Sequence, residues 1–181
     1  MTLTYKLEQN DYLQNQLYLA SKTPRIKRQR TRSWLIVFGS SFLLSFMFYQ
    51  SGNKALFYYF LILGLLALFF YPFYQRSYYK KHYKRFVADI YKNRFGRIVK
   101  VTFTDNTIEQ ITDAGETKIN LSELESISET GEYFFPKLKS GGALIILKNK
   151  EVDVNEFRNE LKLLCGKLNI PFIEDLNWTW K

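Results

Sequence analysis

Few residues of this chain have the chemistry of a catalytic centre. His82 is the only histidine, and it lies among Lys80, Lys81 and Lys84, a setting typical of a membrane-interface residue rather than a general base. Cys165 is the only cysteine, and it falls on the apolar face of a predicted helix, where a small buried hydrophobe is far more common than a nucleophile. No His and Cys cluster has metal-ligand spacing. The sequence therefore predicts a protein that is not an enzyme and binds no metal or cofactor.

Two further patterns have a structural and a functional interpretation. Gly141-Gly142 is followed neither by a helix start nor by Lys-Ser/Thr, so it indicates a hairpin turn rather than a phosphate-binding loop. Glu123, Glu125, Glu129 and Glu132 form either an acidic patch or the solvated face of a strand. A single cysteine allows no intramolecular disulfide, which is consistent with a reducing cytosol.

The charge is divided unevenly along the chain. The net charge is +9, but residues 1–97 hold 16 Lys and Arg against 3 Asp and Glu, net +13, whereas residues 98–181 hold 10 against 14, net −4. Basic charge concentrated beside apolar sequence is attracted to anionic lipid. We therefore expect a membrane surface, and not nucleic acid, as the partner of the basic half.

Two apolar blocks, residues 34–51 and 55–74, contain no charged residue. A helix rises about 1.5 Å per residue, so roughly 20 residues cross a hydrocarbon core of about 30 Å. The second block has no polar face, unlike a core helix of a soluble protein, and the 33 residues before the first block argue against a signal peptide. The blocks predict a transmembrane helical hairpin.

The sequence also predicts how the two spans meet. Ser41, Ser45 and the nearby Gly39 form a small-residue side of the first span, which we expect to pack against Gly64 and Ala67 of the second. Pro72 should kink or end the second span, because proline lacks a backbone donor and clashes with the preceding turn.

The basic residues that flank the spans predict their orientation. Positively charged flanks stay cytoplasmic, and the intervening loop has only Lys54, so both termini are expected in the cytosol of a multi-pass protein of the cell (cytoplasmic) membrane. The residues predicted to contact lipid headgroups or to fix this orientation are Arg25, Lys27, Arg28, Arg30, Arg32, Arg76, Lys80, Lys81, Lys84 and Arg85. For the basic helix at residues 75–93, ordinary orientation charge without lipid selectivity is favoured over selective binding of anionic headgroups.

The remaining sequence alternates between helical and strand periodicity. Residues 1–5 read as a short strand, residues 8–20 as an amphipathic helix ended by Pro24, and residues 75–93 as a basic helix continuing from the second span. About six short strands separated by tight turns follow from Ile98. Asp153, with Glu156 three residues later, starts a last helix that Pro171 ends, and the aromatic tail 178–181 should dock on the domain or on the bilayer.

These elements give a membrane α-helical hairpin joined to an α+β cytosolic domain. The expected organisation is a cytosolic N-terminal helix and basic segment at 1–33, the hairpin at 34–74, a basic juxtamembrane helix at 75–97, and a β domain with a C-terminal helix at 98–181.

Several segments together resemble the YcxB-like family of bacterial membrane proteins. The segments that carry the resemblance are residues 11–13, 20–25, 101–105 with Ile108, 121–124 and 155–157, together with the two spans and the basic helix. The resemblance covers nearly the full chain and implies a C-terminal domain of the PH-like type, a bent antiparallel β-sandwich capped by a helix. The chain departs from the family pattern at Leu121, where the family often has Trp, and at residues 146–148, where it has Ile-Pro-Lys.

Two functions from different classes follow as hypotheses. The first is a non-enzymatic inner-membrane protein whose cytosolic PH-like domain binds a protein partner or a second copy of itself. The second is sensing of an anionic lipid or a small ligand at the cytoplasmic membrane surface. Two spans without an intramembrane ionisable residue argue against transport.

Overall fold

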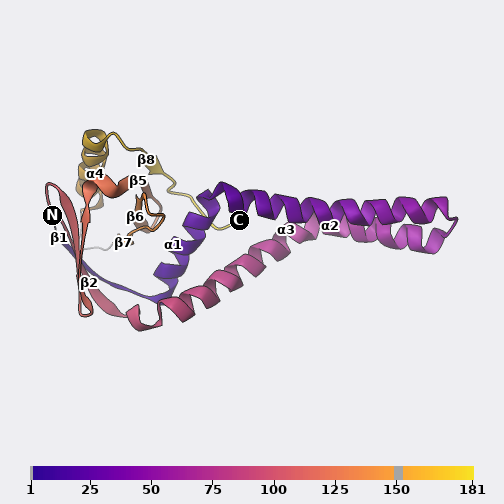
Figure 1. The fold of residues 1–181 in the computed structure, drawn as a ribbon, viewed down its shortest axis with the longest axis horizontal. Coiled ribbons are helices and arrows are strands. Elements are labelled where there is room, and N and C mark those ends of the chain that lie inside the picture. The colour runs from indigo at the N-terminus through magenta and orange to yellow at the C-terminus, as the bar shows by residue number, and fades with distance from the viewer. Residues whose placement is uncertain (1, 149–152) are drawn as a thin grey trace. The chain divides into compact units, whose positions relative to one another are not determined.

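A computed structural model describes residues 2–148 and 153–181 of the chain (Figure 1). The described residues form two compact units. The sheet unit comprises the residues up to Asn15 and Val87–Thr179, and the helical unit comprises Gln16–Phe86 and Trp180–Lys181. Each unit is described by itself below.

The helical unit is built on the two longest helices, α2 (Pro24–Gln50) and α3 (Lys54–Ile90), which run side by side along their apolar stretches (Figure 1). Pro24 starts α2 at a position where its missing N–H costs nothing. Gly52 adopts a left-handed φ of 76° in the turn between the helices, and the Asn53 side chain accepts a bond from the Leu56 backbone N–H at 3.2 Å. The basic segment and the first span are therefore one continuous helix.

The sheet unit contains two four-stranded sheets. The first has the order β1 (Thr2–Leu7), β2 (Arg97–Phe103), β3 (Thr107–Thr112), β4 (Gly115–Asn120) and is antiparallel throughout. The second has the order β7 (Ile146–Leu147), β6 (Tyr133–Leu138), β5 (Leu124–Glu129), β8 (Phe172–Glu174). The short helices η1 (Lys92–Arg94) and η2 (Leu121–Glu123) lead into β2 and β5.

Helices α1 (Gln9–Lys22) and α4 (Val154–Leu168) complete the set of elements. Alternate residues of β1 and β2 are buried, and the Tyr5 hydroxyl donates to the Ile145 carbonyl at 2.7 Å, which links the first sheet to the chain before β7. Phe157 of α4 meets the rings of Phe103 and Phe134 at 5.8 and 5.2 Å between centroids. The core therefore lies between the sheets and under α4.

Most of the elements predicted from the sequence are present. The first strand, the amphipathic helix that ends before Pro24, the long basic extension of the second span and the hairpin turns at residues 104–106 and 113–114 are confirmed. Asp153 caps α4 as predicted, accepting bonds from the backbone N–H groups of Asn155 and Glu156 at 2.9 and 3.2 Å. The coarse class, two long apolar helices with an α+β domain, is confirmed as well.

Two local predictions need correction, and a third is narrowed. Of the kink or end of the second span predicted at Pro72, an end is excluded because helix α3 continues through the proline. Within the strand predicted at residues 143–147, Ile146 and Leu147 form the two-residue strand β7, and Ala143 forms an isolated bridge with Lys137. Asn169, in the left-handed conformation with φ 54°, terminates α4 two residues before Pro171.

Candidate functional site

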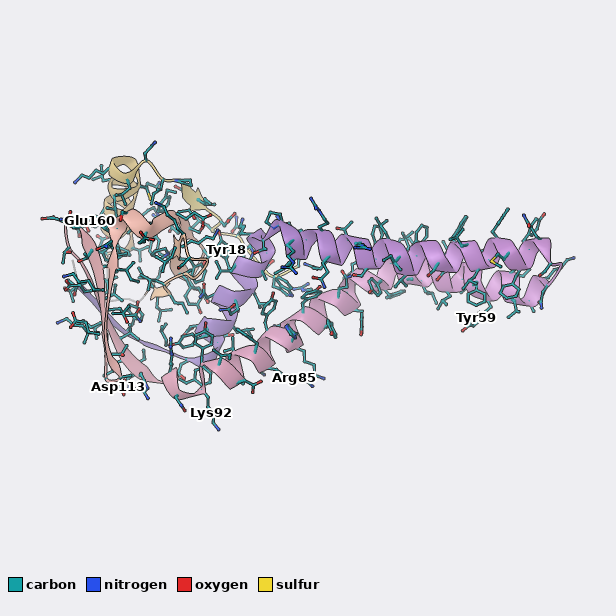
Figure 2. All side chains as sticks on the ribbon, viewed as in Figure 1. Tyr18, Tyr59, Arg85, Lys92, Asp113 and Glu160 are labelled. Carbon is teal, nitrogen blue, oxygen red and sulfur yellow. The ribbon has the colours of Figure 1, made fainter. Side chains whose placement is uncertain are left out.

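The apolar stretches of α2 and α3 present their large side chains outward. Both helices are long and apolar enough to cross a bilayer. In the most apolar 18-residue stretch of each helix, only 11% of the residues of α2 and 6% of those of α3 are buried. Figure 2 shows side chains projecting away from the pair along its length, Tyr59 among them. A buried helix of a soluble core would hide this surface. The exposed apolar surface is therefore suited to lipid.

Two polar side chains of α2 donate hydrogen bonds to α3, whereas Ser40 and Ser41 donate to the Val37 carbonyl of their own helix. The Ser45 hydroxyl donates to the Phe57 carbonyl at 3.1 Å, and the Trp34 indole N–H donates to the Leu68 carbonyl at 3.3 Å. A Cβ atom added to Gly64 would lie 3.3 Å from the Ser41 Cβ, so the helices approach closely at this point. Internal hydrogen bonds and small residues are what hold helices together in lipid, where no hydrophobic force joins them.

One residue of the predicted small-residue side lies elsewhere. Ser41 and Ser45 are buried, but a Cβ on Gly39 would meet nothing within 4 Å. Gly39 is two residues before Ser41, about 200° around the helix, and so cannot share its face. The packing prediction is confirmed for Ser41 and Gly64 and is wrong for Gly39.

The ten predicted headgroup residues form two basic segments, one at the start of α2 and one in the second half of α3. All except Arg30 are exposed, and Figure 2 shows Arg85 extending from α3. Among the described residues, none of the ten forms an ion pair with a carboxylate. This part of the chain thus carries unneutralised positive charge on both helices.

Arg30 differs from the other nine because aromatic rings enclose it. Its guanidinium carbon lies 5.1 Å from the Trp180 ring centroid and 5.8 Å from that of Tyr79. The Trp180 indole N–H donates to the Arg76 carbonyl at 3.0 Å, and the Gln75 amide donates to the Arg30 carbonyl and to the Ser33 hydroxyl, each at 2.9 Å. These contacts join α2 and α3 below their apolar stretches. The aromatic tail therefore docks through Trp180 on this pair of helices, a site that the prediction of docking on the domain or on the bilayer did not include.

The sheet unit contains a cavity of about 400 Å³. Its walls come from the first turns of α1, from η1 and the start of β2, from β3 and β4, and from residues 143–145. Val99 and Leu7 give it an apolar floor, whereas Arg94, Arg97 and Gln110 bring polar groups to it. Figure 2 places Asp113 at the β3–β4 turn, and its carboxylate accepts from the Arg97 guanidinium at 2.9 Å.

Two side chains of α1, Tyr12 and Asn15, line the cavity. Tyr12 stacks on Tyr91 with 4.8 Å between centroids, and burial raises the pKa of Tyr12 although the neighbouring Arg94 opposes the shift. Asn15 is only 5% exposed, and its Oδ1 atom has no hydrogen-bond partner. A buried amide oxygen without a donor is rare in folded proteins.

A second cluster of charges lies between β5 and α4. Glu129 is fully buried and accepts from Lys148 Nζ at 2.6 Å and from Arg158 Nε and Nη2 at 2.7 and 2.6 Å. Burial would raise the pKa of Glu129, but the bonds from Arg158 and Lys148 outweigh it and hold this pKa below its ordinary value. Glu129 is therefore neither part of an acidic patch nor on a solvated strand face. It is buried and paired with Lys148 and Arg158, which lie far from it in the sequence.

Cys165 and His82 are the residues whose side chains could take part in catalysis, and Cys165 is buried on α4 as predicted. Cys165 is 3% exposed, and burial raises the pKa of its thiol to about 11, so it is a buried, unreactive thiol. His82 is exposed on α3, with its ring 5.5 Å from that of Tyr83. In the described ranges 2–148 and 153–181, no group of three or more His, Cys, Asp or Glu is arranged to hold a metal.

Sequence reasoning missed the cavity and the contacts that build it. Tyr133 donates its hydroxyl to Asp11 at 2.7 Å, and this bond fixes the first turn of α1 against β6, on the side of α1 that also carries Asn15. The polar residues Asp11 and Asn15, one turn apart in an amphipathic helix, were the available signal.

No family model, no curated protein and no solved structure matches the chain.

Proposed function

We propose that this chain is a two-span protein of the cytoplasmic membrane, with both termini in the cytosol, whose PH-like domain is a non-enzymatic binding module. The outward apolar surface of α2 and α3, combined with the hydrogen bonds of Ser45 and Trp34 across the pair, is the observation that carries the membrane assignment. Exposed positive charge on both flanks supports the proposed orientation.

The orientation can be tested by thiol labelling. Ser51→Cys, in the turn between the helices, should react with an impermeant maleimide in intact cells, whereas Gln29→Cys should react only after lysis. Ser51 is preferable to Gly52, whose left-handed φ a cysteine would strain, and the buried Cys165 keeps the background low. Labelling of Gln29→Cys in intact cells would overturn the orientation.

A protein partner or a second copy of the chain is the first proposed occupant of the domain. Strand β4 supports this proposal, because within the described residues it pairs with β3 alone and five of its six residues are exposed. An unpaired edge offers a row of backbone donors and acceptors to an added strand. Its Glu116 and Lys118 restrict the partners to those that match these charges.

Photo-cross-linking tests this occupant in native membranes. A photoreactive residue at Asn120, the exposed end of β4, should give a discrete adduct, at twice the mass of the chain if the partner is a second copy. The same residue at Glu160, exposed on α4, is the matched control. Identical adduct patterns from both positions, or none from Asn120, would count against the edge as the binding site.

Sensing of a small anionic ligand is the second proposed function. The cavity beneath Arg94 and the unpartnered Asn15 Oδ1 favour it over a purely structural role for this part of the sheet unit.

A further inference from the structure

We infer that the cavity of the sheet unit binds a small organic anion, a phosphate or carboxylate that also carries an O–H or N–H donor. Arg94 would pair with the anionic group, and Asn15 would accept from the donor. This inference rests on the second function proposed above and names its ligand class and its residues.

Asn15 is the observation that first points to a ligand. It lies on α1, its exposed fraction is only 5%, and it lines the cavity. The Oδ1 atom lacks a donor among the described residues. Leaving a buried acceptor unpaired costs folding free energy, so retaining the amide is explained if a bound molecule supplies the donor.

Arg94 provides the charge for an anion. Its guanidinium carbon lies 5.6 Å from the Tyr91 ring centroid, and within the described residues its side chain makes no ion pair. Arg97, the other arginine of the cavity, is already paired with Asp113. Glu116 is the acidic residue of the lining, and Arg94 is the lining cation that has no acidic partner among the described residues. A guanidinium binds phosphate and carboxylate groups through two parallel N–H bonds.

The size and the walls of the cavity define the rest of the ligand. A volume of about 400 Å³ lies within the range of small-molecule pockets, roughly 300–1,000 Å³. Tyr12 and Tyr91 form a stacked aromatic pair in the lining, and Gln110 and Thr112 add polar groups to it. Such a cavity suits a metabolite-sized molecule rather than a peptide or a polymer.

The test uses the full chain in nanodiscs of phosphatidylcholine, a lipid without net charge. The melting temperature of the protein is followed while inorganic phosphate, citrate or AMP is titrated. At least one of these three probes should raise the melting temperature of the unaltered chain and of Lys92→Gln, the matched control from the same short helix η1. Arg94→Gln and Asn15→Leu should each weaken the apparent affinity for that probe at least about tenfold.

Asn15→Leu also separates a binding role from a structural one. Because the leucine removes an unpaired polar atom and keeps the branched shape of the side chain, the variant without probe should melt at or above the temperature of the unaltered chain. A structural role for the amide predicts the opposite, a lower melting temperature with unchanged probe affinity. That result would overturn the inference.

A parallel titration with phosphatidylglycerol in the nanodiscs distinguishes the source of the anion. A shift that only this lipid produces, and that Arg94→Gln removes, assigns the phosphate to a lipid headgroup. A shift that survives in both variants, or no shift with any probe and with this lipid, would overturn the inference. The cross-linking at Asn120 and the labelling at Ser51 would be unaffected, so the two proposals fail independently.

Discussion

The two units of this protein differ in how their lysine and arginine side chains are paired. In the sheet unit several lysines and arginines form ion pairs with acidic side chains. One of these acidic groups, Glu129, is fully buried and pairs with two cations. In the helical unit the ten flanking lysines and arginines have no acidic partner among the described residues. The sheet unit therefore pairs part of its charge internally, whereas the basic segments of the helical unit leave theirs available to an external anion.

Stability follows the same division. The sheet unit gains from aromatic and aliphatic side chains buried between sheets, with Tyr5, Phe134 and Phe157 at the centre. The apolar side chains of α2 and α3 face outward, so their association relies on the close approach at Gly64 and on hydrogen bonds such as that of Ser45. Changes in the two units should consequently have different effects.

The largest effect is expected from Glu129→Gln. Losing the carboxylate leaves Lys148 and Arg158 without their counter-charge, and breaking a buried ion pair lowers the free energy of unfolding by about 3–5 kcal/mol. Denaturant unfolding of the full chain in detergent, followed by circular dichroism, would measure this loss. Glu125→Gln, which removes an exposed ion pair with Lys137, is the control and should change little.

The pH dependence of this effect has a defined sign. The folded pKa of Glu129 is lower than its unfolded pKa, so its contribution is present above the ordinary glutamate pKa of about 4.3 and is lost as the pH falls through the folded value. The difference between the unaltered chain and Glu129→Gln should be constant near neutral pH and shrink in acid. A difference that grows in acid would contradict the assignment.

A comparable effect of a different kind is expected from replacing Lys80, Lys81 and Lys84 with glutamine. At about 1 kcal/mol per lysine near an anionic surface, the preference for phosphatidylglycerol over phosphatidylcholine should fall by about 3 kcal/mol, roughly a hundredfold. Quenching of tryptophan fluorescence by brominated lipids would report this preference, which in the unaltered chain should weaken steeply with salt.

The control for this triple variant comes from the sheet unit. Glutamine at Lys100, Lys118 and Lys167, three exposed lysines of that unit, removes the same total charge. An equal loss of lipid preference in both variants would mean that net charge alone matters and that the basic helix has no special role.

The smallest effect is expected at the contact between the helices. Gly64→Leu places a side chain where Ser41 already lies 3.3 Å from the added Cβ, and overpacking of this kind costs about 1–3 kcal/mol. Gly39→Leu adds the same group to open space and should be neutral. Cross-linking of cysteine pairs between α2 and α3 would measure the association, and equal loss in both variants would contradict the described packing.

Much of this architecture could be predicted because it depends on local sequence. The lengths of the uncharged blocks, the basic flanks, the turns after Phe103 and Thr112 and the cap at Asp153 are each written in a few consecutive residues. The candidate headgroup residues belong to the same class, since exposed charge beside an apolar helix needs no tertiary contact. Buried Glu129 could not be predicted, because its neighbours in sequence are three exposed glutamates.

The sequence by itself determined the two long apolar helices, the sign of the charge beside them and the strand periodicity after Ile98. Only the tertiary structure decided that β1 pairs with β2 across about ninety residues, that β8 lies parallel to β5, and that Asn15 and Arg94 line one cavity. The physical reason is that periodicity specifies which face of an element is buried but not against what. Partners distant in the chain are chosen by how the whole set of buried faces packs.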